Sequence, residues 1–451
     1  MEQTGEQQSN RMDMLHGSIL DKILLFALPL AASTILQELF NSVDVAVVGK
    51  FASSEALAAV GSNSSVIALM INLFVGISVG ANVVIANYIG KRQEDKVKDT
   101  VHTVMFVALI SGIFLLVLGV TIAKPVLKMM GTPSDVIDLA IIYLRIYFLG
   151  MPFIMLYNFG SAVLRSIGDT RRPLYCLIIA GIVNTCLNLL FVIVFKLSVA
   201  GVAIATVVSN MVSSGMVIYF LTHEKEPIHL SWTELEIVKP ELIKVLRIGV
   251  PAGLQSMVFS ISNVCIQTAI NGFGSYAVAG STAALNYEYF TYFVINAFGQ
   301  AAVTFTSQNY GAGETQRCKK VFRLSMASGM IICGVMSTIF VIWHKFFINI
   351  YTSDSAVVEY ASTRMLHVLF LEFMTGSYEI SGAALRGLGY SMTPAILTVF
   401  GTCVLRIVWL YTVFEKFKSF DVLMNVYPIS WIITGIAVWG TYIVIRKRVF
   451  S

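Results

Sequence analysis

Long apolar stretches recur along the whole of this 451-residue chain, and short polar segments separate them. An α-helix needs about 20 apolar residues to cross the hydrocarbon layer of a membrane. Stretches that meet this requirement lie near 21–49, 57–88, 97–123, 136–163, 172–196, 200–221, 243–271, 277–307, 318–345, 356–385, 394–415 and 424–445. Only 13% of the residues are charged, about half of the ~25% typical of soluble proteins. We therefore predict an all-α polytopic membrane protein with twelve transmembrane helices. A cytoplasmic enzyme, a nucleic-acid-binding protein and a disordered chain are excluded.

The positive charges predict how such a chain is oriented. If the N-terminus is cytoplasmic, the inner segments hold 21 of the 31 lysines and arginines and the outer loops hold 7. Lysine and arginine concentrate in the cytoplasmic loops of membrane proteins, so both termini are expected in the cytoplasm. The polar N-terminal segment lacks the basic-then-apolar pattern of a cleavable signal peptide. We expect a multi-pass protein of a prokaryotic cell (inner) membrane.

The chain contains an internal repeat. Its longest polar stretch, 223–241, divides it almost in half. Similar residues recur at offsets of 221 or 222, namely Leu164–Asp169 with Leu385–Tyr390, Asn87-Tyr88 with Asn309-Tyr310, and Pro29 with Pro251. Fixed-period similarity of this kind indicates a repeated architecture. We predict an N-lobe over 1–222 (helices 1–6), a cytoplasmic linker over 223–241 and a C-lobe over 242–451 (helices 7–12). Two parallel six-helix repeats are typical of transporters.

These motifs resemble the multidrug and toxic compound extrusion (MATE) family. The resemblance rests on Arg165–Thr170, its copy in Leu385–Gly389, the prolines Pro29 and Pro251, and Asn41–Asp44. It covers essentially the whole chain. It implies two six-helix lobes forming a V, and an antiporter that expels organic, often cationic, compounds in exchange for sodium ions or protons. It implies a monomer without a cofactor other than the coupling ion.

Asp44 is the strongest candidate for coupling. A carboxylate within a transmembrane helix costs roughly 2.5–3.5 kcal/mol on insertion scales, so it needs a partner or a function. Its predicted companions are neutral and oxygen-bearing: Gln37 and Asn41 on the same helix, Asn184 and Asn188 on the fifth, and Thr206 on the sixth. One acid with several neutral oxygens suits Na⁺, with Asp44, Asn184 and Thr206 as possible ligands, and a buried acid alternatively takes a proton. The asparagines alternatively form interhelical hydrogen bonds.

The second repeat lacks this cluster. The counterpart of Asp44 lies between Ser262 and Gln267, where no residue is acidic, and Asn184 and Asn188 correspond to Leu405 and Trp409 at offset 221. A cation site is therefore expected in the N-lobe. In the resembled family a second Asp often stands where this chain has Asn188, which leaves the choice between sodium and proton open. The C-lobe acids of another branch are not matched at Gln255 or around Thr375, which favours the DinF-like branch.

A second group of polar residues predicts the substrate cleft. Glu38 lies in the first helix, and Glu288 lies among Tyr287, Tyr289 and Tyr292 in the eighth. An acid among aromatic rings suits an organic cation through charge attraction and cation–π contact. Gln255 and Glu379 complete the predicted cleft. Alternatively, the tyrosines form a packing layer in which Glu288 bonds a neighbouring helix, and Arg364 or Arg406 neutralises Glu372 and Glu379.

The remaining intramembrane features are expected to be structural. Arg145, with Tyr143 and Tyr147, is expected to stabilise the N-lobe. In the two L-R-x-x-G motifs, the glycine is expected to cap a helix whose last turn carries the arginine.

The function predicted from the sequence is a cation-coupled antiporter that exports small amphipathic organic compounds by alternating access. Its partners would be that substrate and the membrane lipids. The alternative is a flippase for lipid-linked precursors. That alternative is disfavoured because only Arg145, Arg364 and Arg406 lie within helices. An intramembrane enzyme is disfavoured because the sequence contains no H-E-x-x-H motif.

Overall fold

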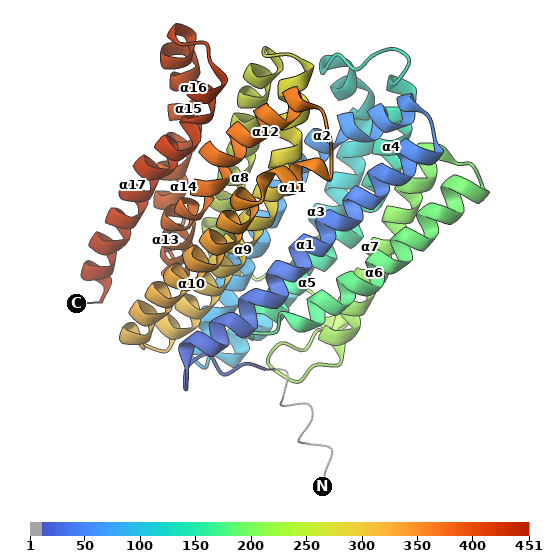
Figure 1. Ribbon diagram of the computed structural model, residues 1–451. Helices are drawn as coiled ribbons and strands as arrows, with labels where there is room; N and C mark the ends of the chain where they lie inside the picture. The colour runs from blue at the N-terminus through green and yellow to red at the C-terminus, as the bar shows by residue number, and fades with distance from the viewer. Residues whose placement is uncertain (1–10, 451) are drawn as a thin grey trace. The chain divides into compact units, whose positions relative to one another are not determined.

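The computed structural model describes residues 11–450, apart from the side chains of Ser54 and Ser65. Every regular element in this part of the chain is helical (Figure 1). The first half contains α1 (Ile19–Phe51), α2 (Ser54–Gly90), α3 (Glu94–Met129), α4 (Ile137–Leu149), α5 (Met151–Ser166), α6 (Arg171–Leu189), the π-helix η2 (Leu190–Val194) and α7 (Ser198–Thr222). The second half contains η3 (Trp232–Glu234), α8 (Lys239–Asn271), α9 (Ser275–Gly311), α10 (Thr315–Ile342), α11 (His344–Asn349), α12 (Ser355–His367), η4 (Leu369–Thr375), α13 (Gly376–Gly387), α14 (Met392–Thr398), η5 (Val399–Val404), α15 (Leu405–Trp409), η6 (Leu410–Phe414), α16 (Phe420–Met424) and α17 (Val426–Val449). The predicted all-α membrane fold is confirmed.

Among the described residues, nine helical segments are individually long and apolar enough to cross a membrane. A tenth span arises if α4 and α5, which meet at a bend of 47°, count as one. The other two predicted spans, 277–307 and 356–385, fall on α9 and on the series α12, η4 and α13. The α9 sequence is diluted by amide and hydroxyl residues, and the second span is broken by the 3₁₀ segment η4.

The helices form two compact units. Among the described residues, unit 1 comprises Arg11, Met12 and Ala32–Gly253, and unit 2 comprises Asp13–Ala31 with Leu254–Phe450. Unit 1 therefore takes 242–253 from the predicted C-lobe, and unit 2 takes 13–31 from the predicted N-lobe. The two boundaries divide α1 and α8 two residues after Pro29 and Pro251, and they lie 222 residues apart, which is the offset of the sequence repeat.

Glycines hold the first part of α8 against α2 inside unit 1. A Cβ atom on Gly249 would lie 3.0 Å from the carbonyl oxygen of Gly76, and one on Gly253 would lie 2.8 Å from the Cα of Leu73. Close helix contact through small residues is characteristic of membrane interiors, where van der Waals packing replaces the hydrophobic effect between helices. This packing explains why 242–253 groups with unit 1 rather than with the rest of its own repeat.

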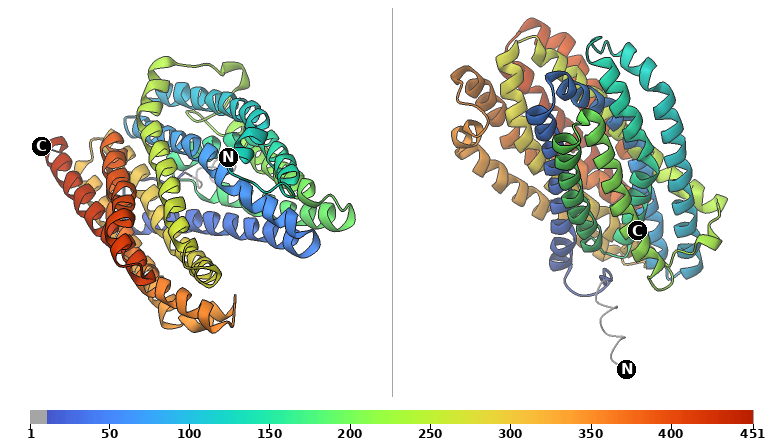
Figure 2. Two further views of the ribbon diagram at one scale, coloured as in Figure 1. Left: turned by 90° about the horizontal axis from the view of Figure 1, so that it is seen from above. Right: turned by 90° about the vertical axis from the view of Figure 1, so that its right-hand side faces the viewer.

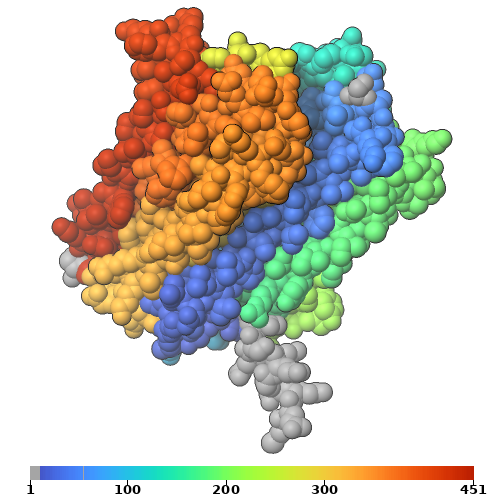
Figure 3. Space-filling model, viewed as in Figure 1, coloured from blue at the N-terminus to red at the C-terminus, as the bar shows by residue number. Residues whose placement is uncertain are grey.

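In unit 2, α9 contacts both α10 and α13, and α13 contacts α17. Phe26, from the first part of α1, packs edge-on against Phe305 of α9 with ring centroids 5.7 Å apart. Phe322 of α10 stacks on Tyr442 of α17 at 3.9 Å. Figure 2 shows the long helices of each unit lying roughly alongside one another, and Figure 3 shows side chains of α10 and α12 covering the near face of unit 2.

The segment between the repeats is docked on unit 1. The backbone N–H groups of Ser231 and Val238 donate to His102 Nε2 and Thr103 Oγ1 of α3, each at 3.1 Å. Lys98 lies 2.9 Å from Glu234, and its hydrogen bond lowers the pKa of that carboxyl below the usual range. Because hydrogen bonds to backbone groups fix a segment's position, the predicted linker is an ordered part of unit 1.

Candidate cation site

Asp44 is buried in unit 1, with 8% of its surface exposed, and meets the predicted polar residues of two other helices. The side-chain amide of Asn188 on α6 donates to Asp44 Oδ1. The Thr206 hydroxyl on α7 lies 3.4 Å from Asp44 Oδ2 and 2.9 Å from the carbonyl oxygen of Val202. A hydroxyl has one proton, so when Thr206 donates in its shorter contact, two oxygens face each other with no proton between them.

Asn188 is fully buried, and its orientation follows from the groups around it. Its Nδ2 donates to Asp44 Oδ1 and, at 3.1 Å, to Asn184 Oδ1. Both amide protons are therefore used. Within the described part of the chain, Asn188 Oδ1 is a buried oxygen without a hydrogen-bond partner. Such an atom is rare in a native protein and calls for an explanation, such as a bound ion.

The chemistry of these groups suits a small cation. Asp44 supplies one negative charge, and Asn184, Asn188 and Thr206 supply neutral oxygens. Hard cations prefer carboxylate, amide and hydroxyl oxygen ligands. The π-helix η2 begins two residues after Asn188, and π-helical turns frequently occur at functional sites. The same carboxylate, surrounded by apolar helices, could equally take up one proton.

Two tyrosines near Asp44 were not predicted as part of this site. Tyr143 and Tyr147 on α4 both interact electrostatically with Asp44, and their rings stack at 6.0 Å. Sequence reasoning grouped them with Arg145 as a stabilising set, but Arg145 is exposed and donates to the carbonyl oxygen of Val120 at 3.3 Å. One sequence feature could have indicated their place near the site: the two tyrosines are four residues apart and so lie on one face of an apolar helix.

The structure does not bring Gln37 and Asn41 into hydrogen bonding with Asp44. Both are exposed, and Asn41 instead bonds the half-buried Glu38. Asn41 is only one turn from Asp44, but its side chain bonds Glu38 on the preceding turn. At 1.5 Å per residue, Gln37 is about 10 Å along the axis from Asp44. Gln37, Glu38 and Asn41 therefore form a separate polar stretch of α1.

Glu288 does not present a free carboxylate. It is 6% exposed, and its two oxygens accept from Arg364 Nε and Nη2 at 2.7 and 2.9 Å. A paired, two-pronged contact of this kind already neutralises the acid. The predicted role of Glu288 as a counter-ion for substrate is therefore corrected, and the alternative of a bond to a neighbouring helix describes the observed contact. Arg364 is thus occupied by Glu288 rather than by Glu372 or Glu379.

The tyrosines around Glu288 have different environments. Tyr287 is buried, and its hydroxyl donates to the carbonyl oxygen of Phe347 at 2.9 Å, in a core cluster with Met365 and Leu369. It therefore packs rather than lines a cleft. Tyr289 is exposed and stacks on Phe293 with centroids 6.0 Å apart.

The other predicted cleft residues of unit 2 form a network around Arg386. Arg386 Nη1 donates to Gln255 Oε1 at 3.2 Å, and Tyr292 donates to Glu379 Oε1 at 3.4 Å. Arg386 and Glu379 also interact electrostatically. The predicted cap of the L-R-x-x-G motif is present, since Gly389 has φ +91° and donates to the carbonyl oxygen of Arg386. The Arg386 side chain, however, joins a polar network that the motif alone did not predict.

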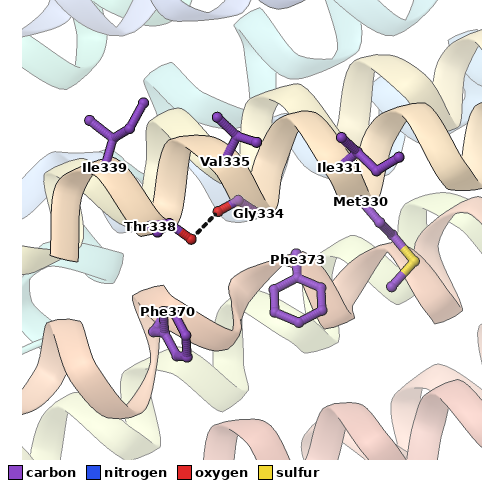
Figure 4. Close-up of a pocket in the computed structure, with 8 residues that line it drawn as sticks. All are labelled: Met330, Ile331, Gly334, Val335, Thr338, Ile339, Phe370 and Phe373. Carbon is purple, nitrogen blue, oxygen red and sulfur yellow. Dashed lines mark hydrogen bonds between the residues drawn. The ribbon is translucent and has the colours of Figure 1, made fainter. Parts of the chain in front are cut away.

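An apolar groove of about 470 Å³ lies between α10 and η4 (Figure 4). Phe370 and Phe373 lie on one side of the α10 ribbon, and Ile331, Val335 and Ile339 lie on the other. Its one hydroxyl, on Thr338, donates to the carbonyl oxygen of Gly334 at 2.7 Å. The groove therefore offers hydrocarbon contact and is chemically distinct from the Asp44 site.

The repeated helical fold with its long apolar spans is that of a membrane transporter. Residues 29–190 and 251–412 each match the model of the MatE family, so this chain belongs to the MatE family. The two matches have equal length and begin 222 residues apart, which confirms the internal repeat.

Individual relatives agree with this assignment. The chain is 26% identical over 440 residues to the probable multidrug resistance protein YoeA of Bacillus subtilis, covering 96% of this chain and 95% of that protein. It is 24% identical over 386 residues to the probable multidrug resistance protein NorM of Thermotoga maritima, covering 84% and 82%. Its fold matches the outward-facing structure of a multidrug resistance MATE family transporter with a TM-score of 0.91 at 21% identity, covering 97% and 98%.

Proposed function

We propose that this chain is a cation-coupled antiporter that exports small amphipathic organic compounds, and that the Asp44 group loads the coupling cation. The observation that carries this proposal is a buried carboxylate next to the unpaired Oδ1 of Asn188. Relatives along most of the chain are named as multidrug resistance proteins, which supports drugs as the substrate class.

Exchange requires that the coupling cation and the substrate favour different states of the transporter. A carboxylate that alternates between cation-bound and cation-free forms provides such a difference, because an ionised carboxylate without a bound cation is costly in an apolar interior. Cation loading therefore favours the state in which the Asp44 group is closed, and the unloaded form favours a state that admits water. Substrate need not contact Asp44 for this coupling to operate.

The half-buried acids Glu38 and Glu379 remain proposed contacts for substrate, together with Tyr292 and Gln255. Glu379 interacts with Arg386, and Glu38 has only an amide partner, Asn41, among the interactions of the described residues. A cationic compound that approaches Glu38 therefore displaces no cationic side chain of the described residues.

Membrane lipids are proposed as the other partners. Large apolar side chains of α3 face outward, with Ile113, Phe114 and Val117 each more than half exposed. Contiguous apolar surface of this kind requires an apolar environment. Lipid chains would supply it without a second protein, as expected of a monomer.

The flippase alternative is weakened by the contacts of the intramembrane arginines. Arg364 is paired with Glu288, and Arg406 donates to Ser430 and Asn263. Both guanidinium groups are also buried, so neither is exposed to hold a pyrophosphate.

Proteoliposomes with separately imposed sodium and pH gradients test the proposal. Substrate efflux should respond to one of the two gradients. If sodium is the ion, Asn184→Ala and Thr206→Ala should raise the sodium concentration for half-maximal transport about tenfold, because each removes an oxygen ligand. If the proton is the ion, these variants should change transport much less. Efflux that responds to neither gradient would contradict cation coupling.

A further inference from the structure

Unit 2 contains a buried cluster of charges that the proposed function does not use. Two acids, Glu288 and Glu372, and two arginines, Arg364 and Arg406, all have exposed fractions of 6% or less. Glu288 and Arg364 form the ion pair described above, and Glu372 interacts electrostatically with both arginines. With all four groups ionised the cluster is neutral.

Arg406 occupies a position that corresponds to the Asp44 group. The two family matches are offset by 222 residues, which aligns Arg406 with Asn184. In unit 1, Asn184 and Asn188 on α6 meet Asp44 on α1 and Thr206 on α7. In unit 2, Arg406 on α15 meets Asn263 on α8 and Ser430 on α17. The same three parts of each repeat therefore converge, with the Arg406 guanidinium in the second and the unpaired Oδ1 of Asn188 in the first.

The contacts of Arg406 resemble a cage around a cation. Its Nε lies 3.2 Å from Ser430 Oγ, and its Nη1 lies 3.4 Å from Asn263 Oδ1. The ring centroids of Tyr427 and Phe259 lie 4.6 and 5.5 Å from its Cζ, within the range of cation–π contact. Nη2 has no hydrogen-bond partner among the described residues. Charge and aromatic faces thus hold the group, rather than a full set of acceptors.

We propose that Arg406 is a resident cation, which permanently fills the counterpart in unit 2 of the cation site in unit 1. Once Arg406 is removed, the same cage binds a small monovalent organic cation of the guanidinium class. This inference rests on the proposed function in treating the Asp44 group as a cation site. Unit 2 then keeps a constant charge while unit 1 exchanges its cation, which explains why one of the two repeats carries an exchangeable acid.

The test is chemical replacement of the missing guanidinium. Purified Arg406→Ala should have a lower apparent Tm than the wild type. The reason is that the buried Glu372 then lacks the positive charge that compensates it, since Arg364 is paired with Glu288. Millimolar guanidinium chloride should raise that Tm in a saturable way, as a ligand that binds only the folded state does. Choline chloride at the same ionic strength should not, and wild-type protein should show no such rise.

Arg145→Ala is the matched control, since it removes an exposed arginine of α4 from unit 1. Its Tm should not respond to guanidinium. An equal response in the wild type, in Arg145→Ala and in Arg406→Ala would overturn the proposal, as would the absence of any response in Arg406→Ala.

A second comparison applies if Arg406→Ala does not fold. Arg406→Lys keeps the charge, Arg406→Met keeps much of the volume, and Arg406→Met combined with Glu372→Gln restores neutrality. The proposal predicts more folded protein in membranes for the lysine and double variants than for Arg406→Met alone. Equal yields of the three would overturn it.

The guanidinium test of Arg406 does not depend on whether Asp44 binds the coupling cation. The guanidinium response of Arg406→Ala should persist in an Asp44→Asn background, because the two groups lie in different units. If Asp44 proved unnecessary for coupling, the response would still report whether the unit 2 cage binds a cation.

Discussion

At the residue scale, the Asp44 group carries one acid because residue 188 is an asparagine, whose amide is neutral, and not an aspartate. The Asn188 amide donates to the Asp44 carboxylate and leaves its own oxygen unpaired. An aspartate there would place two acids next to each other, and such a pair cannot ionise fully without a cation between them. The single acid of this chain is therefore expected to hold its cation more weakly than a two-acid site would.

Asn188→Asp tests this relation. The added negative charge should lower the cation concentration for half-maximal transport about tenfold, which corresponds to roughly 1.4 kcal/mol of added interaction. The measurement is initial efflux from proteoliposomes as a function of the coupling ion. Asn158→Asp, on α5, is the control because Asn158 bonds its own helix at Ile154. An unchanged concentration dependence in Asn188→Asp would place the cation elsewhere.

The glycine at the end of the second L-R-x-x-G motif has a conformational role. Gly389 has φ +91°, which other residues adopt only with strain. Gly389→Ala should therefore destabilise unit 2 by about 1–2 kcal/mol. Gly440→Ala, inside α17 with open space around its Cβ position, should be neutral or stabilising. Thermal unfolding in detergent measures both, and equal Tm values would show that the cap geometry is not required.

At the element scale, periodicity and length predicted the helices, because apolar stretches of this size specify transmembrane helices directly. The bend between α4 and α5 lies at Gly150 and Pro152, a local signal for a break that the single predicted span 136–163 did not use. The 3₁₀ segment η4 has no comparable signal in the sequence. The asparagines and threonine of the Asp44 group were predictable from their residue types. The Glu288–Arg364 pair was not, because 76 residues separate its members and several acids competed for each arginine.

The docked linker gives a prediction for an element that sequence composition alone would describe as a polar loop. His102 is buried and accepts from the backbone N–H of Ser231. His102→Ala leaves that donor unpaired, at a cost of about 1–3 kcal/mol. Trypsin cleavage after the exposed Lys225 should then be about tenfold faster. His344→Ala, on α11, should leave the rate unchanged, and equal rates in the two variants would argue against docking through His102.

At the scale of the whole molecule, the distribution of lysine and arginine predicts the orientation. Arg92 and Lys320 lie in the two basic inner segments 91–98 and 317–323, one in each repeat. Arg92→Cys and Lys320→Cys, introduced into a chain without other reactive cysteines, should react with membrane-impermeant reagents from the cytoplasmic side alone. A Lys124→Cys variant should react from the opposite side. Labelling of residue 92 or 320 from outside intact cells would disprove both the topology and the parallel arrangement of the repeats.

The central claim is that the transporter stores its coupling cation on Asp44. Asn at this position keeps the shape and most hydrogen bonds but carries no charge, so Asp44→Asn should fold normally. The most direct measurement is gradient-driven accumulation of a labelled substrate in proteoliposomes that contain Asp44→Asn, beside the wild type and the exposed-acid control Asp138→Asn. We predict that accumulation falls to the level of protein-free liposomes in Asp44→Asn and stays at the wild-type level in Asp138→Asn. Wild-type accumulation by Asp44→Asn, at equal protein content, would contradict the claim.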